Sequence, residues 1–236
     1  FFYLRREDGF AIDTPAEAKK SFARLGIIPP LGPIDHEEKL LDAAYVRSNM
    51  ESRLSSRHFR NQLHILASSG EWDSFIMWSR NWLDGIAIEA PRIQGGALDV
   101  FHHEPPSRIP KELIWAGDGI QVWLQILYHV FRNRDCESLI LDEPEVFLHP
   151  DLQRRLVALL ESTGKQVVMA THSAEVAAEV DPAMVALVDK STRHAARAKT
   201  DEQLELLSQS IGSSFNLRLA KALRASGVIF VEGQDM

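Results

Sequence analysis

The sequence predicts an α/β fold in which a mainly parallel sheet is flanked by helices. One apolar run begins at Ser138 and ends in Asp142 and Glu143, and a second occupies residues 166–170. Between and after these runs, segments with apolar residues at helical spacing alternate with short apolar segments of strand length. Such alternation is typical of a parallel sheet with helices packed on it.

Composition limits the classes of protein to which the chain can belong. Its 236 residues, 45% hydrophobic and 25% charged, suffice for a sizeable core in one or two domains. No apolar run reaches the roughly 18 residues of a membrane helix. The single cysteine, Cys136, excludes an internal disulfide framework and favours a cytoplasmic location. The net charge of −7 excludes a wholly basic nucleic-acid clamp, so we expect any such contact to come from local patches.

The first third of the chain is expected to be mostly helical. Residues 1–12 predict a hairpin around Asp8-Gly9, and Thr14-Pro15 begins a helix that runs to about residue 25. Residues 26–33 contain three prolines and two glycines, which indicates a loop. Further helices are predicted at 36–50, 54–68 and 72–83, the last with a tryptophan-rich apolar face expected to be core.

A cationic stripe is predicted in this helical region. Arg53, Arg57, Arg60 and His64 recur at i, i+4, i+7 and i+11, which places them on one face of a helix. The stripe could follow nucleic-acid phosphates or sense the nucleotide. The alternative is that these arginines brace the domain and are neutralised by neighbouring acids, namely Glu37, Glu38 and Glu51.

Two strands are predicted next, at 86–89 and 97–103, and the second leads into His102-His103-Glu104. Adjacent residues of a strand point to opposite faces, so these side chains are not expected to form one metal site. We interpret the two histidines as surface residues.

The acidic end of the run at 138–142 carries the predicted chemistry. A strand that delivers Asp142 and Glu143 to its carboxyl end can hold Mg²⁺ beside a general base, where open α/β sheets bind their ligands. We expect Asp142 to orient Mg²⁺ and Glu143 to polarise an attacking water during phosphoryl transfer. His172, after the strand at 166–170, could donate to the γ-phosphate as charge develops there.

The rest of the chain continues the alternation. Pro150-Asp151 begins a helix whose apolar face toward the sheet is Leu152, Leu156, Leu159 and Leu160. A helix at 174–179 and a strand at 184–188 follow, and 193–199 is expected to be a basic linker. Helices at 201–209 and 214–225 lead to a last strand that ends in Glu232-Gly233.

These motifs resemble those of a known family. The run Leu139-Ile-Leu-Asp-Glu-Pro-Glu-Val-Phe-Leu-His-Pro150 looks like the Walker B motif and D-loop of ABC-type ATPases, and Ala170-Thr-His-Ser173 resembles their H-loop. More narrowly, the chain is similar over residues 111–190 to the AAA ATPase heads of the OLD (overcoming lysogenisation defect) and RecF-like family. The resemblance implies ATP and Mg²⁺ as cofactors and a nucleotide contact at Asp151.

Trp115-Ala-Gly-Asp-Gly-Ile-Gln121 is the candidate signature motif of this family. Apolar residues at helical spacing follow it, so Gly119 is expected near a helix amino terminus, where backbone N–H groups favour an anion. The resemblance implies that Gly117, Asp118, Gly119 and Gln121 contact the γ-phosphate bound by the opposite subunit. Asp118 departs from the family pattern, which has a serine there, and a carboxylate beside a phosphate is unfavourable unless a cation intervenes. The alternative is that Gly117 and Gly119 simply form a turn.

The family's phosphate-binding loop has no counterpart in the sequence. No Gly-x-x-x-x-Gly-Lys-Ser/Thr occurs, and the chain opens in an apolar run without an initiator Met. We therefore expect these residues to be a segment of a longer protein that does not hydrolyse ATP by itself. At the other end, the strand ending in Glu232-Gly233 resembles the start of a Toprim nuclease domain, which implies a metal-binding or acid–base role for Glu232.

The resemblance gives the following domain boundaries: the end of an ATPase lobe at 1–33, a helical insert at 34–93, an ABC ATPase core at 94–192, linker helices at 193–226 and the start of a Toprim-like domain at 227–236. It implies the ATPase head of an ATP-dependent nuclease acting on nucleic acid in phage defence or DNA repair, with DNA as the expected target. The resemblance implies a homodimer through head-to-tail ATPase heads, and it allows for a companion effector protein as a further partner. The alternatives are a non-nuclease RecF- or SMC-like clamp or sensor, and a degenerate scaffold supported only by Asp118.

Overall fold

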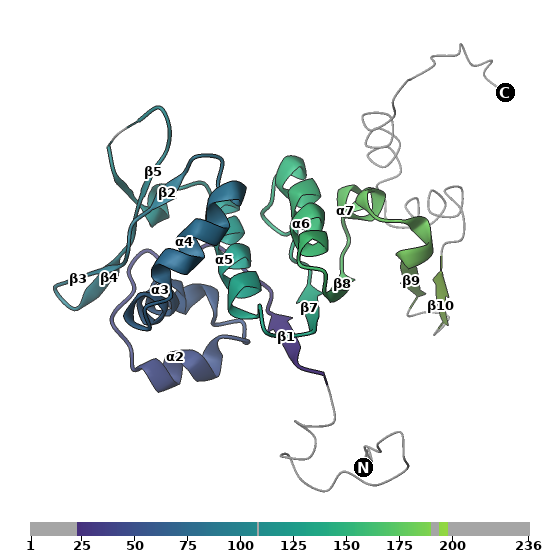
Figure 1. Ribbon diagram of the computed structural model, residues 1–236, viewed down its shortest axis with the longest axis horizontal. Coiled ribbons are helices and arrows are strands. Elements are labelled where there is room, and N and C mark those ends of the chain that lie inside the picture. Colours follow the sequence, from purple (N-terminus) through teal and green to yellow (C-terminus); the bar gives the residue numbers. More distant parts are fainter. Residues whose placement is uncertain (1–22, 108, 190–193, 198–236) are drawn as a thin grey trace, which may run out of the picture. The chain divides into compact units, whose positions relative to one another are not determined.

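The computed structural model describes residues 23–107, 109–189 and 194–197 (Figure 1). The chain divides into two compact units. The first contains the described residues up to His149 together with Leu160–Ala170, and the second contains Pro150–Leu159 and the described residues from Thr171 onward. The hairpin predicted at 1–12, most of the helix predicted from Thr14 and every element predicted beyond residue 200 lie outside the described residues.

A three-stranded parallel sheet forms the base of the first unit. Its order is β1 (Leu25–Ile28), β7 (Ser138–Asp142) and β8 (Gln166–Ala170), so β7 lies in the middle. Leu139 and Leu141 of β7 are buried, which is why this run is apolar. The strands predicted at 138–142 and 166–170 are confirmed, and so is the parallel α/β architecture.

Strand β1 corrects the loop predicted at 26–33 and the helix predicted up to residue 25. Gly26, which we interpreted as a loop residue, lies opposite Leu139 in the sheet. A β-carbon at Gly26 would come within 2.7 Å of the Asn133 side chain, so glycine is required here by close packing and not by a turn.

Helices α2 (Ala43–Asn49), α3 (Phe59–Ser68) and α4 (Trp72–Ser79) form the helical insert. A 3₁₀ turn, η1 (Ser56–His58), precedes α3, and another, η2 (Arg80–Trp82), follows α4. The helix predicted at 36–50 begins only at Ala43, because the Asp42 carboxylate accepts hydrogen bonds from the amides of Ala44 and Tyr45 and caps the helix there.

The longest helix, α5 (Asp118–Arg132), is buried on nearly all sides and fills the core of the first unit. Its Tyr128 and Phe131 rings contact Phe75 of α4, and Tyr128 also contacts Phe59 of α3. Aromatic edge-to-face pairs of this kind add to the apolar burial that joins the insert to α5. The helix predicted after the signature motif is therefore confirmed.

The sequence between α4 and α5 forms short antiparallel strands in two small sheets. One sheet has the order β2 (Ala87–Ile88), β5 (Phe101–His103), β6 (Lys111–Glu112), and β3 (Arg92–Gln94) pairs with β4 (Ala97–Asp99). The strand predicted at 97–103 is thus two strands in different sheets. His102 is 0% exposed, which corrects its interpretation as a surface residue, whereas His103 is partly exposed and pairs with Glu89.

Helix α6 (Pro150–Ser162) connects β7 to β8 along the chain. Leu156, Leu159 and Leu160 are buried as predicted, whereas Leu152 is partly exposed. The second unit also contains α7 (Ala174–Glu179), η4 (Pro182–Met184), β9 (Ala186–Asp189) and β10 (His194–Arg197). Strand β10 pairs antiparallel with β9, so part of the predicted linker at 193–199 is a strand. Within the described ranges, no helix has both the length and the apolar character to cross a membrane.

Candidate functional site

The carboxyl end of β7 presents two adjacent carboxylates. Asp142 is the last residue of the strand and lies opposite Ala170 of β8. The amide of Glu143 donates a hydrogen bond of 2.9 Å to the Ala170 carbonyl, which fixes the first residue after the strand. Both acidic residues are exposed. The parallel sheet therefore ends in an accessible acidic pair, as the sequence predicted.

Glu143 has a left-handed backbone conformation. Its φ is 46°, a region that costs a residue with a β-carbon about 1–2 kcal/mol relative to ordinary backbone. Phe147, four residues later, has a φ of 69°. Between them, Val146 N–H donates to the Glu143 carbonyl and Leu148 N–H to the Glu145 carbonyl, so two consecutive turns hold the segment. Backbone strain of this kind persists where the surroundings impose it, and it is concentrated at functional sites.

The acidic pair fits Mg²⁺ bound together with a phosphate. Within the part of the chain that the structure describes, no three His, Cys, Asp or Glu side chains are grouped to hold a metal. Mg²⁺ seldom requires such a cage, because it is usually bound by one or two carboxylates, substrate phosphate oxygens and water. The exposed carboxylates of Asp142 and Glu143 are donors of this kind. The assignment of Asp142 to Mg²⁺ and of Glu143 to the attacking water stays a prediction.

The predicted H-loop lies in the second unit, where hydroxyl groups fix its backbone. Ser173 N–H donates to Thr171 Oγ1 at 3.0 Å, and Ser173 Oγ accepts from the Val176 amide at 3.2 Å, which caps α7. Ser173 Oγ also donates to Gln153 Oε1 of α6 at 2.6 Å. His172, between the two hydroxyl residues, is exposed. The loop thus holds its main chain in place and leaves the imidazole accessible.

Asp151 lies in the first turn of α6 and is exposed. Its carboxylate forms an ion pair with Arg154, which also pairs with Glu175 of α7 at 3.2 Å. The predicted nucleotide contact of Asp151 stays a prediction.

The candidate signature loop leads into α5. A 3₁₀ turn, η3 (Leu113–Trp115), is followed by Gly117 at the N-cap position and by Asp118 and Gly119 in the first turn of α5. Gly117 has no side chain with which to cap the amides of Asp118 and Gly119, whereas the Ile120 amide already donates to the Gly117 carbonyl at 2.8 Å. Gly117 and Asp118 are exposed, and Trp115 is 74% exposed. The predicted position of Gly119 near a helix amino terminus is confirmed.

Gln121 lies in the same turn but is buried. Its Oε1 accepts from the Ile34 amide at 3.0 Å, and its Nε2 donates to the carbonyls of Ile114 at 3.2 Å and Ala116 at 2.8 Å. Both amide protons are therefore used by the main chain. We reassign Gln121 from a phosphate contact to a residue that positions the loop.

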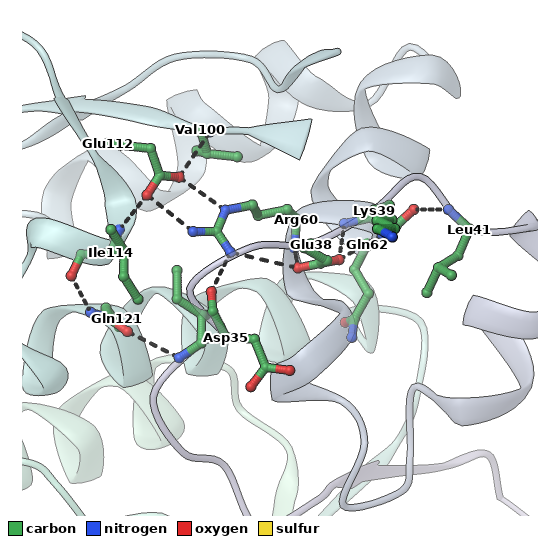
Figure 2. A network of polar contacts seen from close by, with 12 residues as sticks. Asp35, Glu38, Lys39, Leu41, Arg60, Gln62, Val100, Glu112, Ile114 and Gln121 are labelled. Carbon is green, nitrogen blue, oxygen red and sulfur yellow. Dashed lines mark hydrogen bonds and ion pairs between the residues drawn. The ribbon is translucent and has the colours of Figure 1, made fainter. Parts of the chain in front are cut away.

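Arg60 corrects the predicted cationic stripe. It is 1% exposed and lies in the first turn of α3, which begins only at Phe59. Its guanidinium donates to both oxygens of Glu112, at 2.9 and 3.0 Å, and to the Asp35 carbonyl at 2.8 Å (Figure 2). The alternative that the arginine braces the domain is the one that the structure supports. Arg53 and Arg57 lie before α3 and are exposed.

Glu112 was not singled out from the sequence, and Glu38 was named there only as a neighbouring acid that neutralises the arginines. Glu38 is buried and accepts hydrogen bonds from the amides of Arg60 and Asn61, so it caps α3 from 22 residues away in the sequence. Burial raises the pKa of the Glu38 carboxyl against the effect of these hydrogen bonds. For Glu112, burial acts in the same direction, but hydrogen bonds from Arg60 and Ile114 lower its pKa overall.

Comparison with known proteins decides the family. Residues 6–178 match the model of the family described as "AAA domain, putative AbiEii toxin, Type IV TA system". The chain belongs to this AAA domain family. The AAA domain match includes the acidic pair, the signature loop and the H-loop, and it confirms the expected resemblance to an ATPase head.

The AAA domain is also similar to one curated protein, the Old nuclease of Escherichia phage P2. The two are 29% identical over 161 residues, which cover 60% of this chain and 27% of the nuclease. The chain therefore spans about a quarter of the length of the curated relative it matches.

Two SMC structures are similar to part of the chain. The Smc head domain of Pyrococcus yayanosii has a TM-score of 0.45 at 12% identity, covering 58% of this chain and 28% of that one. A structure from a study of ATP-driven dimerisation and DNA-stimulated activation of SMC ATPases has a TM-score of 0.47 at 14% identity. It covers 61% of this chain and 97% of that one. Both scores are low, and the α/β fold of the chain follows from the sheet and helices described above.

Proposed function

We propose that this AAA domain is the ATP-binding and ATP-hydrolysing head of an OLD-like, ATP-dependent nuclease that acts on nucleic acid in phage defence or DNA repair. The observation that carries the proposal is the exposed pair Asp142 and Glu143, with Glu143 strained and tied to the neighbouring strand. Similarity to the Old nuclease over part of its length supports the nuclease assignment.

Each residue of the proposed site has one role. Glu143 accepts a proton from the water that attacks the γ-phosphorus of ATP, and ADP leaves with the electrons of the broken P–O bond. Asp142 would hold Mg²⁺, which would supply positive charge to neutralise the phosphate oxygens. His172 donates a hydrogen bond to the γ-phosphate as its charge develops.

The signature loop is proposed to act on the ATP held by a second copy of the chain in a head-to-tail dimer. Gly117 and Gly119 would offer backbone amides to the γ-phosphate, in keeping with their place at the start of α5. Asp118 brings a carboxylate to the same turn, so we propose that a cation or a proton accompanies the phosphate there. In this proposal ATP closes the dimer, and closure is coupled to cutting of nucleic acid by a Toprim-like domain that begins at residue 227 and contains Glu232.

Two variants of one residue in the complete protein test the assignment of the base. Glu143→Gln keeps the side-chain shape but cannot accept the proton, so ATP hydrolysis should fall about 10²- to 10⁴-fold while ATP binding is preserved. Glu143→Gly should also abolish hydrolysis, but it relieves the left-handed backbone and should raise the free energy of unfolding by roughly 0.5–1 kcal/mol. Turnover unchanged in either variant would remove Glu143 from the mechanism.

Cleavage of a supercoiled plasmid by the complete protein, with and without ATP, tests the nuclease assignment. ATP-dependent cutting supports the proposal. ATP hydrolysis without cutting would instead favour the clamp or sensor that recruits a separate effector.

A further inference from the structure

A series of buried and partly buried hydrogen bonds connects the helical insert to the signature loop (Figure 2). It begins at Arg60 on α3, whose side chain is 1% exposed. Its Nε and Nη2 donate to the two carboxylate oxygens of Glu112, and its Nη1 donates to the Asp35 carbonyl. A guanidinium that binds a carboxylate with two parallel hydrogen bonds fixes both the distance and the orientation of its partner.

Glu112 passes this constraint to the main chain before the signature loop. Its Oε2 accepts from the Ile114 amide at 2.7 Å, which caps η3, and its Oε1 accepts from the Val100 amide at 3.3 Å. From the other side, Gln121 binds the carbonyls of Ile114 and Ala116. The main chain at residues 114–116, just before Gly117, is therefore held by Glu112 of β6 on one side and by Gln121 of α5 on the other.

Hydrogen bonds to Glu38 fix the other end of this network, at the first turn of α3. Glu38 accepts hydrogen bonds from the amides of Arg60 at 2.8 Å and Asn61 at 2.7 Å, so the first turn of α3 cannot shift without breaking them. The Asn61 side chain in turn donates to Glu38 and to the Lys39 carbonyl. Displacement of α3 would therefore displace Glu112 and the loop with it.

We propose that Arg60 is a positioning residue for the signature loop, and that through Glu112 it transmits the position of the helical insert to the residues that act on the partner's ATP. The inference rests on the proposed function and extends it to the regulation of the same site. Whatever binds or moves the helical insert would thereby change the rate of hydrolysis without touching the nucleotide.

Arg60→Lys in the complete protein tests the proposal. A lysine ammonium cannot form the two parallel hydrogen bonds to Glu112, so the position of the signature loop is no longer fixed relative to α3. We expect kcat for ATP hydrolysis to fall about tenfold while the affinity of a single head for ATP changes less than about twofold. Amide hydrogen exchange at residues 113–117 should accelerate about tenfold in the same variant.

Glu112→Gln is the second variant, because it keeps an acceptor for the Ile114 amide and removes the charge that Arg60 binds. The double variant should be no slower than the worse single variant, since both residues act through one contact. Arg132→Gln is the control. It breaks an ion pair of 3.0 Å between α5 and Glu51 that makes no contact with the loop, and kcat should be unchanged.

The outcomes separate this inference from the proposed function. Unchanged kcat in both Arg60→Lys and Glu112→Gln, in a protein that hydrolyses ATP, would overturn the coupling. Unchanged exchange at 113–117 would show that Arg60 does not hold the loop, and would overturn it as well. If the unmodified protein neither binds nor hydrolyses ATP, the proposed function fails, and the exchange result still decides whether Arg60 positions the loop.

Discussion

Acidification should destabilise the first unit through His129, in the last turn of α5. This imidazole is 0% exposed, and its Nε2 lies 3.0 Å from Ser55 Oγ. Among the described residues, its Nδ1 has no hydrogen-bond partner. Burial, with a smaller effect of the Arg132 charge, lowers the pKa of His129 to about 3. The folded protein therefore keeps this imidazole neutral at pH values where the unfolded chain protonates it.

The change in the free energy of unfolding with pH follows from the difference between the pKa of His129 in the folded and the unfolded state. Since the folded pKa is lowered from 6.5 to about 3, the unfolded state binds more protons between these values. Stability is complete above pH 6.5 and is lost as the pH falls toward 3, by about 1.4 kcal/mol per pH unit. Between pH 7 and pH 5, His129 alone should lower the free energy of unfolding by about 2 kcal/mol.

Urea unfolding of the protein and of His129→Gln at pH 7 and pH 5 measures the contribution of His129 to the pH dependence of the free energy of unfolding. Glutamine does not titrate, so the loss of stability between the two pH values should be about 2 kcal/mol smaller in the variant. Leu63→Ala is a control that lowers stability by emptying a buried position of α3 while leaving the loss on acidification as it was. Equal losses in the protein and in His129→Gln would refute the argument that burial holds this imidazole neutral.

Two further predictions concern packing and capping. Glu38→Ala should lower the free energy of unfolding by about 3 kcal/mol in urea titrations, because the buried amides of Arg60 and Asn61 lose their acceptor. Glu38→Gln should cost less, since one oxygen still accepts; an equal cost would exclude this capping role. Gly26→Ala should cost about 1–3 kcal/mol, because the new β-carbon would lie 2.7 Å from the Asn133 side chain. A neutral result for Gly26→Ala would contradict the close packing of β1 on α5.

The elements with a strong repeating pattern could be predicted from the sequence. Strand β7 and helix α5 are long enough for their apolar spacing to identify them, and Asp142 and Glu143 follow from the end of β7. Strand β1 could not be predicted, because it has four residues, one of them the glycine that packing requires. Its strand conformation is imposed by pairing with β7, which lies more than 100 residues later.

The burial of Arg60 also could not be predicted from the sequence. Spacing of i, i+4 and i+7 defines one helical face only if the whole segment is one helix, and here α3 begins at Phe59. Its partner Glu112 lies 52 residues away, and no local pattern links the two. The left-handed conformation of Glu143 was also unpredictable, because nothing about a glutamate in the sequence indicates a positive φ.

The capping of α3 by Glu38 limits where the chain can be truncated or recombined with related sequences. A fragment that starts at α2 would contain the whole of α3 but not the carboxylate that holds its first turn, and Arg60 would lose the Asp35 carbonyl as well. At the other side, a fragment that stops before Glu112 would leave a buried guanidinium without its anion. Chimaeras that exchange the helical insert should therefore transfer Asp35 through Glu112 as a single block.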